Sequence, residues 1–340
     1  MAAKSIYAAS DTKRRAKAWS TVVGLALLVV VVFVISMNTG YIRLSPLDVG
    51  KTLMGFGTDK QELILFQFRL PRIVISVLVG AGFALAGCIL QGITRNPLAD
   101  PGLIGVNAGA SLMVILFVAL RPSISAAPPY TLPFLAFFGA AAAGATVYFL
   151  AYKKSDGVSV MRLILVGIAV QAGISAAIVV LTMRLNPEQY QFAATWLAGS
   201  LWGTNWKFVL TLLPWMAVFI PFVLSKARTL NVLSLGDHLS VGLGARLQRE
   251  RLLLLLAAVA LAGSCVAVGG AISFIGLIGP HLARRLVGSR HEILLAASAL
   301  SGSVLLIAAD TISRISDTPT GIIVAIIGAP YFIYLLARAR

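Results

Sequence analysis

Long apolar segments separated by shorter polar ones run through most of the chain. An apolar run of about 20 residues is long enough for a helix that crosses the hydrocarbon core of a bilayer. The pattern contains about ten such runs, so we predict an all-α integral membrane protein with about ten transmembrane helices in a single domain, residues 1–340. The predicted spans are Thr21–Met37, Ile73–Gln91, Leu103–Leu120, Leu132–Tyr152, Leu163–Met183, Phe208–Leu224, Leu252–Val268, Ala271–Val287, Ile293–Ala309 and Gly321–Ala337.

Basic residues set the predicted orientation of these spans. The chain carries 28 Lys and Arg against 12 Asp and Glu, and cytoplasmic loops of membrane proteins are enriched in Lys and Arg. With ten spans and a cytoplasmic segment at residues 1–18, most basic residues lie inside and both termini are cytoplasmic. The first apolar core is about span length and no A-x-A-like site follows it, so we expect an uncleaved first helix.

Composition and motifs exclude several classes of function. Charged residues make up 12% of the chain, against roughly 25% in soluble domains, and without a long basic run on a polar face we predict no nucleic-acid partner. The tail of a nucleotide-binding loop at Gly50–Thr52 lacks its first glycine, since Ser45 stands there, so we predict no catalytic residues and no enzyme activity. Cys88 and Cys265 lie in apolar segments, and the histidines show no metal spacing. We therefore predict neither a metal site nor a cofactor.

The segment Gln91–Ala110, which reads QGITRNPLADPGLIGVNAGA, interrupts the apolar pattern. Pro97 and Pro101 lack a backbone N–H and disfavour the α conformation in the residues before them. The glycines that follow allow close packing where the next helix begins. We therefore predict a break between two spans at this segment.

Polar connections of unusual length lie on both sides of the predicted membrane. Asn38–Arg72 and Leu185–Asn205 are predicted outside, and Leu185–Asn205 is expected to lie along the interface. Inside, Ser225–Glu250 alternates apolar residues with glycines, which predicts two short helices joined by a glycine turn. Its exposed apolar side chains would contact a cytosolic partner. The residues predicted for this contact are Leu235, Gly236, Leu239, Gly242, Leu243 and Gly244.

Two further features leave alternatives open. The tetrapeptide G-L-I-G occurs at Gly102–Gly105 and Gly276–Gly279, as an inverted repeat of spans 2–5 and 7–10 would require, although four residues are a short match. Asp310 lies at the end of the ninth span, four residues before Arg314. This spacing favours an intramembrane ion pair on one helix face. The alternative is a proton relay of the kind found in ion-coupled transporters.

The motifs of the chain resemble those of one known family. They are R-L-P-R at Arg69–Arg72, N-P-L-A-D-P at Asn96–Pro101, W-L-A-G-S-L-W-G at Trp196–Gly203, F-I-G-L-I-G-P-H-L-A-R at Phe274–Arg284, A-A-D-T-I-S-R at Ala308–Arg314 and G-A-P-Y-F at Gly328–Phe332. In this order they resemble the permease subunits of the iron–siderophore and cobalamin ABC importers, from about Arg69 to the end of the chain.

The resemblance implies a multi-pass permease of the bacterial inner or plasma membrane, embedded in lipid, that imports an iron(III)–siderophore chelate. Its partners would be a second permease subunit in a homodimer or heterodimer, two ATPase subunits that hydrolyse ATP, and an extracytoplasmic substrate-binding protein. Cobalamin and haem are alternative substrates within the same family. The alternative from a different class is an ion-coupled secondary transporter, which Asp310 would support.

The resemblance also implies roles for individual residues. Arg69, Arg72 and Arg314 match basic residues that pair with the binding protein, and on the outer face they would present positive charge to that partner. Here Arg314 is followed after two residues by Asp317 and its Thr-Pro-Thr-Gly, a shorter spacer than the family's, which alters the reach of Arg314.

The same comparison implies two gates along the path. Asn96 and Leu98 match the constriction at the inner mouth. Asn186 and Pro187 match the region of the outer gate.

Overall fold

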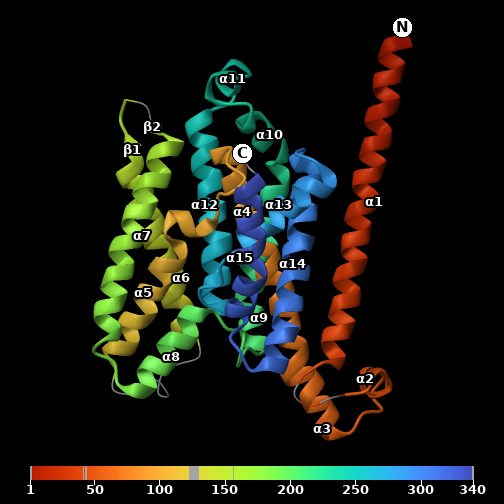
Figure 1. The fold of residues 1–340 in the computed structure, drawn as a ribbon, viewed down its shortest axis with the longest axis vertical. Coiled ribbons are helices and arrows are strands. Elements are labelled where there is room, and N and C mark those ends of the chain that lie inside the picture. Colours follow the sequence, from red (N-terminus) through yellow and green to blue (C-terminus); the bar gives the residue numbers. More distant parts are fainter. Residues whose placement is uncertain (1, 41, 43, 122–129, 156, 339–340) are drawn as a thin grey trace.

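The computed structural model describes residues 2–40, 42, 44–121, 130–155 and 157–338, which form a bundle of helices (Figure 1). Two short antiparallel strands, β1 (Tyr152–Lys153) and β2 (Gly157–Val158), form a hairpin between two long helices. The helices are α1 (Ala2–Asn38), α2 (Pro46–Leu53), α3 (Asp59–Glu62), the π-helix η1 (Leu63–Arg69), α4 (Leu70–Thr94), the 3₁₀-helix η2 (Pro101–Ile104), α5 (Val106–Ala119), α6 (Thr131–Ala151), α7 (Val160–Thr182), α8 (Pro187–Ala198), α9 (Trp206–Ser225), α10 (Ala227–Ser234), α11 (Asp237–Gly242), α12 (Leu247–Gly269), α13 (Ile275–Val287), α14 (His291–Ser316) and α15 (Thr320–Arg338).

The prediction of an all-α membrane protein is confirmed, and every predicted span overlaps a helix. Within the described residues, seven helical segments are long and apolar enough to cross a membrane, and α5 and α15 contribute shorter apolar helices. The predicted eighth span, Ala271–Val287, is shorter than expected, because α13 covers Ile275–Val287. An irregular stretch after Gly269 takes up the first residues of the predicted span.

The two ends of the bundle carry different connections (Figure 1). The start of α1, the β1–β2 hairpin and the α10–α11 arm lie toward one end, and α2, α3 and α8 lie at the other. This distribution agrees with the predicted topology, in which residues 1–18 and 225–250 are cytoplasmic and residues 38–72 and 185–205 are outside. The segment at residues 1–18 is not separate from the first span, because α1 runs continuously from Ala2.

The connection at residues 225–250 has the predicted form. Two short helices, α10 and α11, are joined at Leu235 and Gly236. Gly236 has φ 109°, a backbone conformation that side chains disfavour, so the turn requires a glycine there. The predicted pair of short helices with a glycine turn is confirmed.

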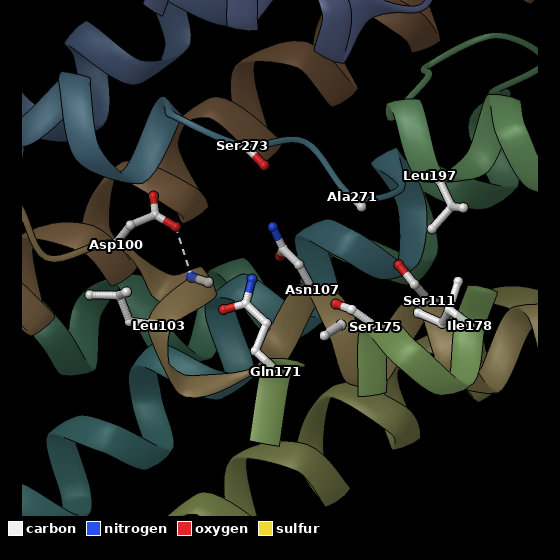
Figure 2. A pocket seen from close by; sticks show the side chains of 12 residues that line it. Asp100, Leu103, Asn107, Ser111, Gln171, Ser175, Ile178, Leu197, Ala271 and Ser273 are labelled. Carbon is white, nitrogen blue, oxygen red and sulfur yellow. Dashed lines mark hydrogen bonds between the residues drawn. The ribbon is translucent and has the colours of Figure 1, made fainter. Parts of the chain in front are cut away.

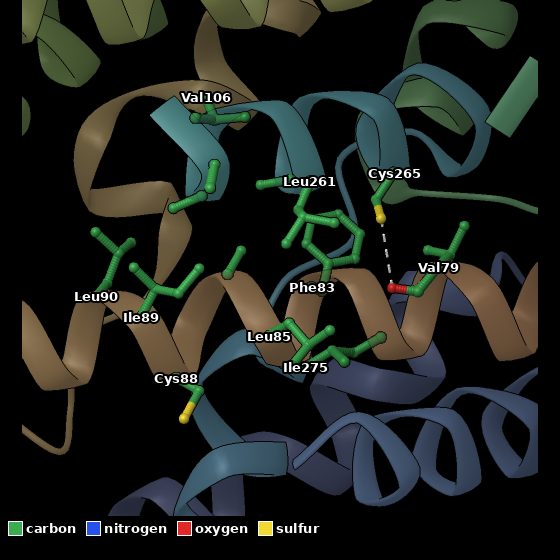
Figure 3. Packing of buried hydrophobic residues seen from close by; sticks show 14 of the residues in the cluster. Val79, Phe83, Leu85, Cys88, Ile89, Leu90, Val106, Leu261, Cys265 and Ile275 are labelled. Atoms are coloured by element: carbon green, nitrogen blue, oxygen red, sulfur yellow. Dashed lines mark hydrogen bonds between the residues drawn. The ribbon is translucent and has the colours of Figure 1, made fainter. Parts of the chain in front are cut away.

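The centre of the bundle is α4, which is buried along most of its length. Its apolar side chains pack against α12 and against α13 (Figure 3). Phe83 and Leu85 are almost completely buried. Cys265 of α12 is also buried, and its thiol lies 3.6 Å from the carbonyl oxygen of Val79. This agrees with the prediction that the cysteine is a packing residue.

Glycines bring α4 very close to its neighbours. A Cβ placed on Gly302 of α14 would lie 2.3 Å from the carbonyl oxygen of Gly80, and a Cβ on Gly87 would lie 1.8 Å from the carbonyl oxygen of Gly276 in α13. Small residues at such crossings let two helix backbones pack directly together, which is how helices associate in a membrane. The packing of α4 against α13 and α14 therefore requires glycine, which has no side chain, at these positions.

The structure predicts different effects for the same substitution at two glycines. Gly302→Ala should lower the free energy of unfolding by about 1–3 kcal/mol, because one methyl group forces α4 and α14 apart. Gly24→Ala in α1 is the matched control, since a Cβ at Gly24 meets nothing within 4 Å. It should leave stability unchanged or slightly raised. Thermal unfolding of the purified protein in detergent measures both, and equal midpoints for the two variants would contradict the packing argument.

Candidate functional site

A cavity of about 320 Å³ opens between α5, α7 and the end of α8, beside the breaks that precede η2 and α13 (Figure 2). Its position between membrane-spanning helices makes it the candidate site for a transported molecule. Its lining consists of Asp100, Gly102, Leu103, Asn107, Ala108, Ser111, Gln171, Ser175, Ile178, Leu197, Ala271 and Ser273.

Two helices each contribute an amide and a hydroxyl to this cavity. Asn107 and Ser111 lie one turn apart on α5, and Gln171 and Ser175 lie one turn apart on α7. Figure 2 shows the amide groups of Asn107 and Gln171 extending into the same space. The Asn107 side-chain nitrogen lies 3.4 Å from the carbonyl oxygen of Ile272, whereas within the described part of the chain its buried oxygen accepts no hydrogen bond. That oxygen can accept a hydrogen bond from a ligand.

The charge of the cavity is small. Asp100 contributes a carboxyl group, and its Oδ1 accepts a hydrogen bond of 2.7 Å from the backbone N–H of Gly102. The other polar lining groups are neutral amides and hydroxyls. The cavity therefore suits a polar molecule with little net negative charge.

The predicted inner gate lies in the break between α4 and η2. Arg95 ends α4 in a left-handed conformation with φ 55°, and the Asn96 side chain accepts a hydrogen bond of 2.9 Å from the N–H of Leu98. A second cavity of about 420 Å³ lies beside this break and is lined by Asn96, Met161 and Asp237 among others. The structure thus places Asn96 at the edge of an inner cavity, and Leu98 is half-buried beside it.

Asp237, the first residue of α11, connects the α10–α11 arm to this break. Its Oδ1 lies 3.1 Å from a guanidinium nitrogen of Arg95 and 2.6 Å from one of Arg251 in α12. Arg251 is buried and also donates a hydrogen bond to the carbonyl oxygen of Val158 in β2. One carboxylate therefore links α11, the end of α4 and α12.

At the outer end, Asn186 and Pro187 form the start of α8. The Asn186 side chain accepts a hydrogen bond of 2.8 Å from the N–H of Gln189, and Pro187 occupies the first turn. The Gln189 side chain donates to the carbonyl oxygens of Val118 and Arg121, at 3.0 and 2.7 Å. These bonds fasten α8 to the end of α5, and Leu197 near the other end of α8 lines the cavity.

The three arginines predicted to present charge on the outer face are largely covered instead. Arg69 is 6% exposed and donates hydrogen bonds to the carbonyl oxygens of Met37 and Ile42. The side chains of Arg72 and Arg314 are 12% and 8% exposed. The expectation of exposed guanidinium groups was wrong, because the outer end of α1 and the segment after it cover this region. Their docking role stays a prediction.

The predicted ion pair is present and has a third member. Asp310 is fully buried, and its two carboxylate oxygens lie 2.8 Å from Nε of Arg72 and 3.2 Å from Nε of Arg314. Arg314 also donates a hydrogen bond of 3.1 Å to the carbonyl oxygen of Ser36 at the end of α1. One buried carboxylate therefore joins α4 and α14 through two guanidinium groups.

Sequence patterns did not single out the cavity residues Asn107 and Gln171 or the linking residue Asp237. The available signal was a polar residue one turn from a serine in an otherwise apolar helix, which marks a polar helix face inside the membrane. For Asp237 no local signal existed, because its partners Arg95 and Arg251 come from other elements.

Comparison with known proteins places these features in a family. The family model described as the FecCD transport family matches residues 27–338. The chain is 49% identical over 322 residues to the iron(3+)-hydroxamate import system permease protein FhuG of Bacillus subtilis (strain 168), an alignment that covers 92% of this chain and 95% of that protein. It is 43% identical to the Fe(3+)-citrate import system permease protein YfmE of the same organism, over 96% of this chain and 97% of that protein.

A solved structure agrees with the fold. An inward-facing conformation of a metal-chelate type ABC transporter superposes with a TM-score of 0.84 and 33% sequence identity, covering 94% of this chain and 99% of that one. Sequence and structure lead to one conclusion: the chain is a multi-pass bacterial membrane protein of the FecCD transport family.

Proposed function

We propose that this chain is the permease subunit of an ATP-driven importer that takes up an iron(III)–siderophore chelate across the bacterial cell membrane. The observation that carries the proposal is the 49% identity to an iron(3+)-hydroxamate permease over 92% of the chain. A second permease would complete the path, two ATPase subunits would supply the energy, and an external binding protein would deliver the chelate.

The cavity is the proposed passage for the chelate. It lies between the predicted outer gate, at the start of α8, and the predicted inner gate at Asn96. Leu197 of α8 and Asp100 of the inner break line it together, so movement at either gate would change its shape. A second permease packed against α5 and α7 would close its open side.

The chemistry of the lining favours a chelate of low net charge. Amides and hydroxyls such as those of Asn107 and Gln171 bind neutral oxygen-rich ligands by hydrogen bonds, and Asp100 would repel a polyanion. A hydroxamate chelate of iron(III) fits this description better than a ferric citrate complex, which carries uncompensated carboxylates. The proposed substrate class is therefore the hydroxamate siderophores.

Uptake of radioactive iron tests the proposal directly. Cells that lack this gene should lose most uptake of a ferric hydroxamate while they retain uptake of ferric citrate and haemin, and the intact gene on a plasmid should restore the loss. Unchanged hydroxamate uptake would contradict the proposal. So would uptake that survives loss of the ATPase subunits and collapses with an uncoupler, the behaviour of an ion-coupled transporter.

The α10–α11 arm is the proposed contact with the ATPase. Leu235, Leu239 and Leu243 are 55%, 61% and 65% exposed, a group of apolar side chains that is unusual on a polar face unless it contacts a partner. Gly236, Gly242 and Gly244 accompany them in the same arm. Asp237 then offers a route by which movement of the arm would reach the inner gate, since it binds Arg95 directly.

Two substitutions in this arm should separate docking from transmission. Leu239→Asp should release the ATPase from the purified complex, because a charge enters an apolar contact. Asp237→Asn should retain the ATPase but reduce transport roughly tenfold, because the link from α11 to Arg95 and Arg251 loses its charge. Co-purification and uptake in vesicles measure the two effects. Normal transport by Asp237→Asn would remove the proposed route.

A third experiment distinguishes the buried ion pair from a proton relay. Asp310→Asn should lower the free energy of unfolding by roughly 3–5 kcal/mol, because Arg72 and Arg314 lose their anionic partner in a buried site. Asp317→Asn, at an exposed position at the end of α14, is the matched control and should have little effect. Thermal unfolding measures both variants. An Asp310→Asn protein that unfolds like the wild type but no longer transports would favour the relay instead.

A further inference from the structure

The side chain of Asn231 in α10 holds that helix against the start of α14. Its oxygen accepts a hydrogen bond of 2.9 Å from the backbone N–H of His291, and the same oxygen lies 2.8 Å from Nδ1 of the His291 ring. Its nitrogen donates a hydrogen bond of 2.7 Å to Oε2 of Glu292. One side chain therefore binds both of the residues with which α14 begins.

The chemistry of these bonds fixes the orientation of the side chains. An ionised carboxylate only accepts hydrogen bonds, so the group of Asn231 that faces Glu292 is the amide nitrogen. The amide oxygen then faces His291, and because this oxygen also only accepts, the ring carries a proton on Nδ1. His291 is 1% exposed, so water does not compete for its bonds. A leucine at position 231 would have nearly the same shape as asparagine and would make none of these bonds.

Two polar links thus join the α10–α11 arm to two different parts of the bundle. Asp237 of α11 binds Arg95 at the end of α4, and Asn231 of α10 binds the start of α14. The two links belong to separate helices of the arm. Movement of α10 would therefore reach α14 without passing through the break after α4.

The helix α14 runs from the arm to the opposite end of the bundle (Figure 1). It is continuous from His291 to Ser316, without an internal proline. Gly302 packs directly on the backbone of α4. Near the outer end, Asp310 binds an arginine of α4 and Arg314 donates a hydrogen bond to the end of α1. Coupling between distant sites is carried by such rigid elements, so a displacement at one end of α14 would reach the other.

We infer that Asn231 is a positioning residue through which α14 transmits the docking of the external binding protein to the ATPase. The inference rests on the proposed function, in which the binding protein docks at the outer end and the ATPase contacts the arm. Docking would shift α14, and the bonds to Asn231 would pass this shift to α10. Without these bonds, α14 and the arm would move independently, and ATP hydrolysis would no longer respond to the binding protein.

ATP hydrolysis by the complete importer complex in lipid nanodiscs tests this inference, because both faces of the complex are accessible there. The quantity measured is the ratio of the rate with binding protein, loaded with a ferric hydroxamate, to the rate without it. The wild-type complex should be stimulated. Asn231→Leu should reduce the stimulation by roughly fivefold or more, the lower end of typical coupling between two sites. The ATPase should still co-purify, because the exposed leucines of the arm are unchanged.

The matched control lies on the same helix. Ser234 is exposed, and its hydroxyl group bonds to the backbone carbonyl oxygen of Asn231 within α10. Ser234→Ala should keep the wild-type ratio. If Asn231 had only a structural role, both rates of its variant would fall together, so an unchanged ratio in Asn231→Leu would overturn the inference. An equal loss of stimulation in both variants would also overturn it.

A second pair of variants keeps the test decisive if the Asn231→Leu complex does not assemble. His291→Asn and His291→Leu introduce side chains of similar shape, but only that of asparagine can donate a hydrogen bond in place of Nδ1–H. Stimulation should be retained in His291→Asn and reduced in His291→Leu, and equal stimulation in the two would overturn the inference. A wild-type complex that does not respond to the binding protein would instead contradict the proposed function itself, and this inference with it.

Discussion

Direct backbone contact between α4 and the helices around it sets the geometry of this protein. Where Gly80 faces Gly302 and Gly87 faces Gly276, no side chain separates the two chains. Lipid tails are as apolar as leucine, so helices in a membrane gain little from burying apolar surface and depend on close packing instead. The central helix therefore holds α13 and α14 at a fixed distance from itself. This packing also fixes where the irregular segments at the ends of these helices lie.

Those irregular segments line part of the polar cavity, through Asp100 and Ser273. A backbone that leaves the helical conformation inside a membrane is tolerated only where protein or a water-filled cavity surrounds it. The breaks after α4 and α12 meet this condition because they face each other: a Cβ on Gly276 would lie 2.5 Å from the Pro101 ring. The cavity with Asn107 and Gln171 lies beside them. The inverted repeat suggested by the two G-L-I-G segments stays a prediction, although Gly276 of the second segment contacts Pro101, which directly precedes the first.

Local sequence patterns were sufficient to predict the helices but not the contacts between them. Apolar runs located the spans, the glycines of residues 225–250 predicted two short helices, and the four-residue spacing predicted the pair of Asp310 with Arg314. The burial of Arg69 could not be predicted, because it depends on the end of α1 reaching its guanidinium group. The cavity was missed for the same reason, since Asn107 and Gln171 come from different helices. Contacts between segments that are distant in the sequence are fixed by tertiary packing. The hydrophobic periodicity of a single helix does not determine them.

The π-helical turn at Leu63–Arg69 makes this segment sensitive to its own length. A π-helix closes its hydrogen bonds over five residues instead of four, so it holds more residues per turn than the α-helix that it joins. Loss of one residue there would let the turn relax to an α-helix. The chain that directly precedes the turn would then rotate by about 100° relative to α4. The outer segment with α2 and α3 would then point in a new direction, and Arg69 would leave its carbonyl acceptors. A substitution in this turn would keep that direction, whereas the insertion or deletion of one residue would change it.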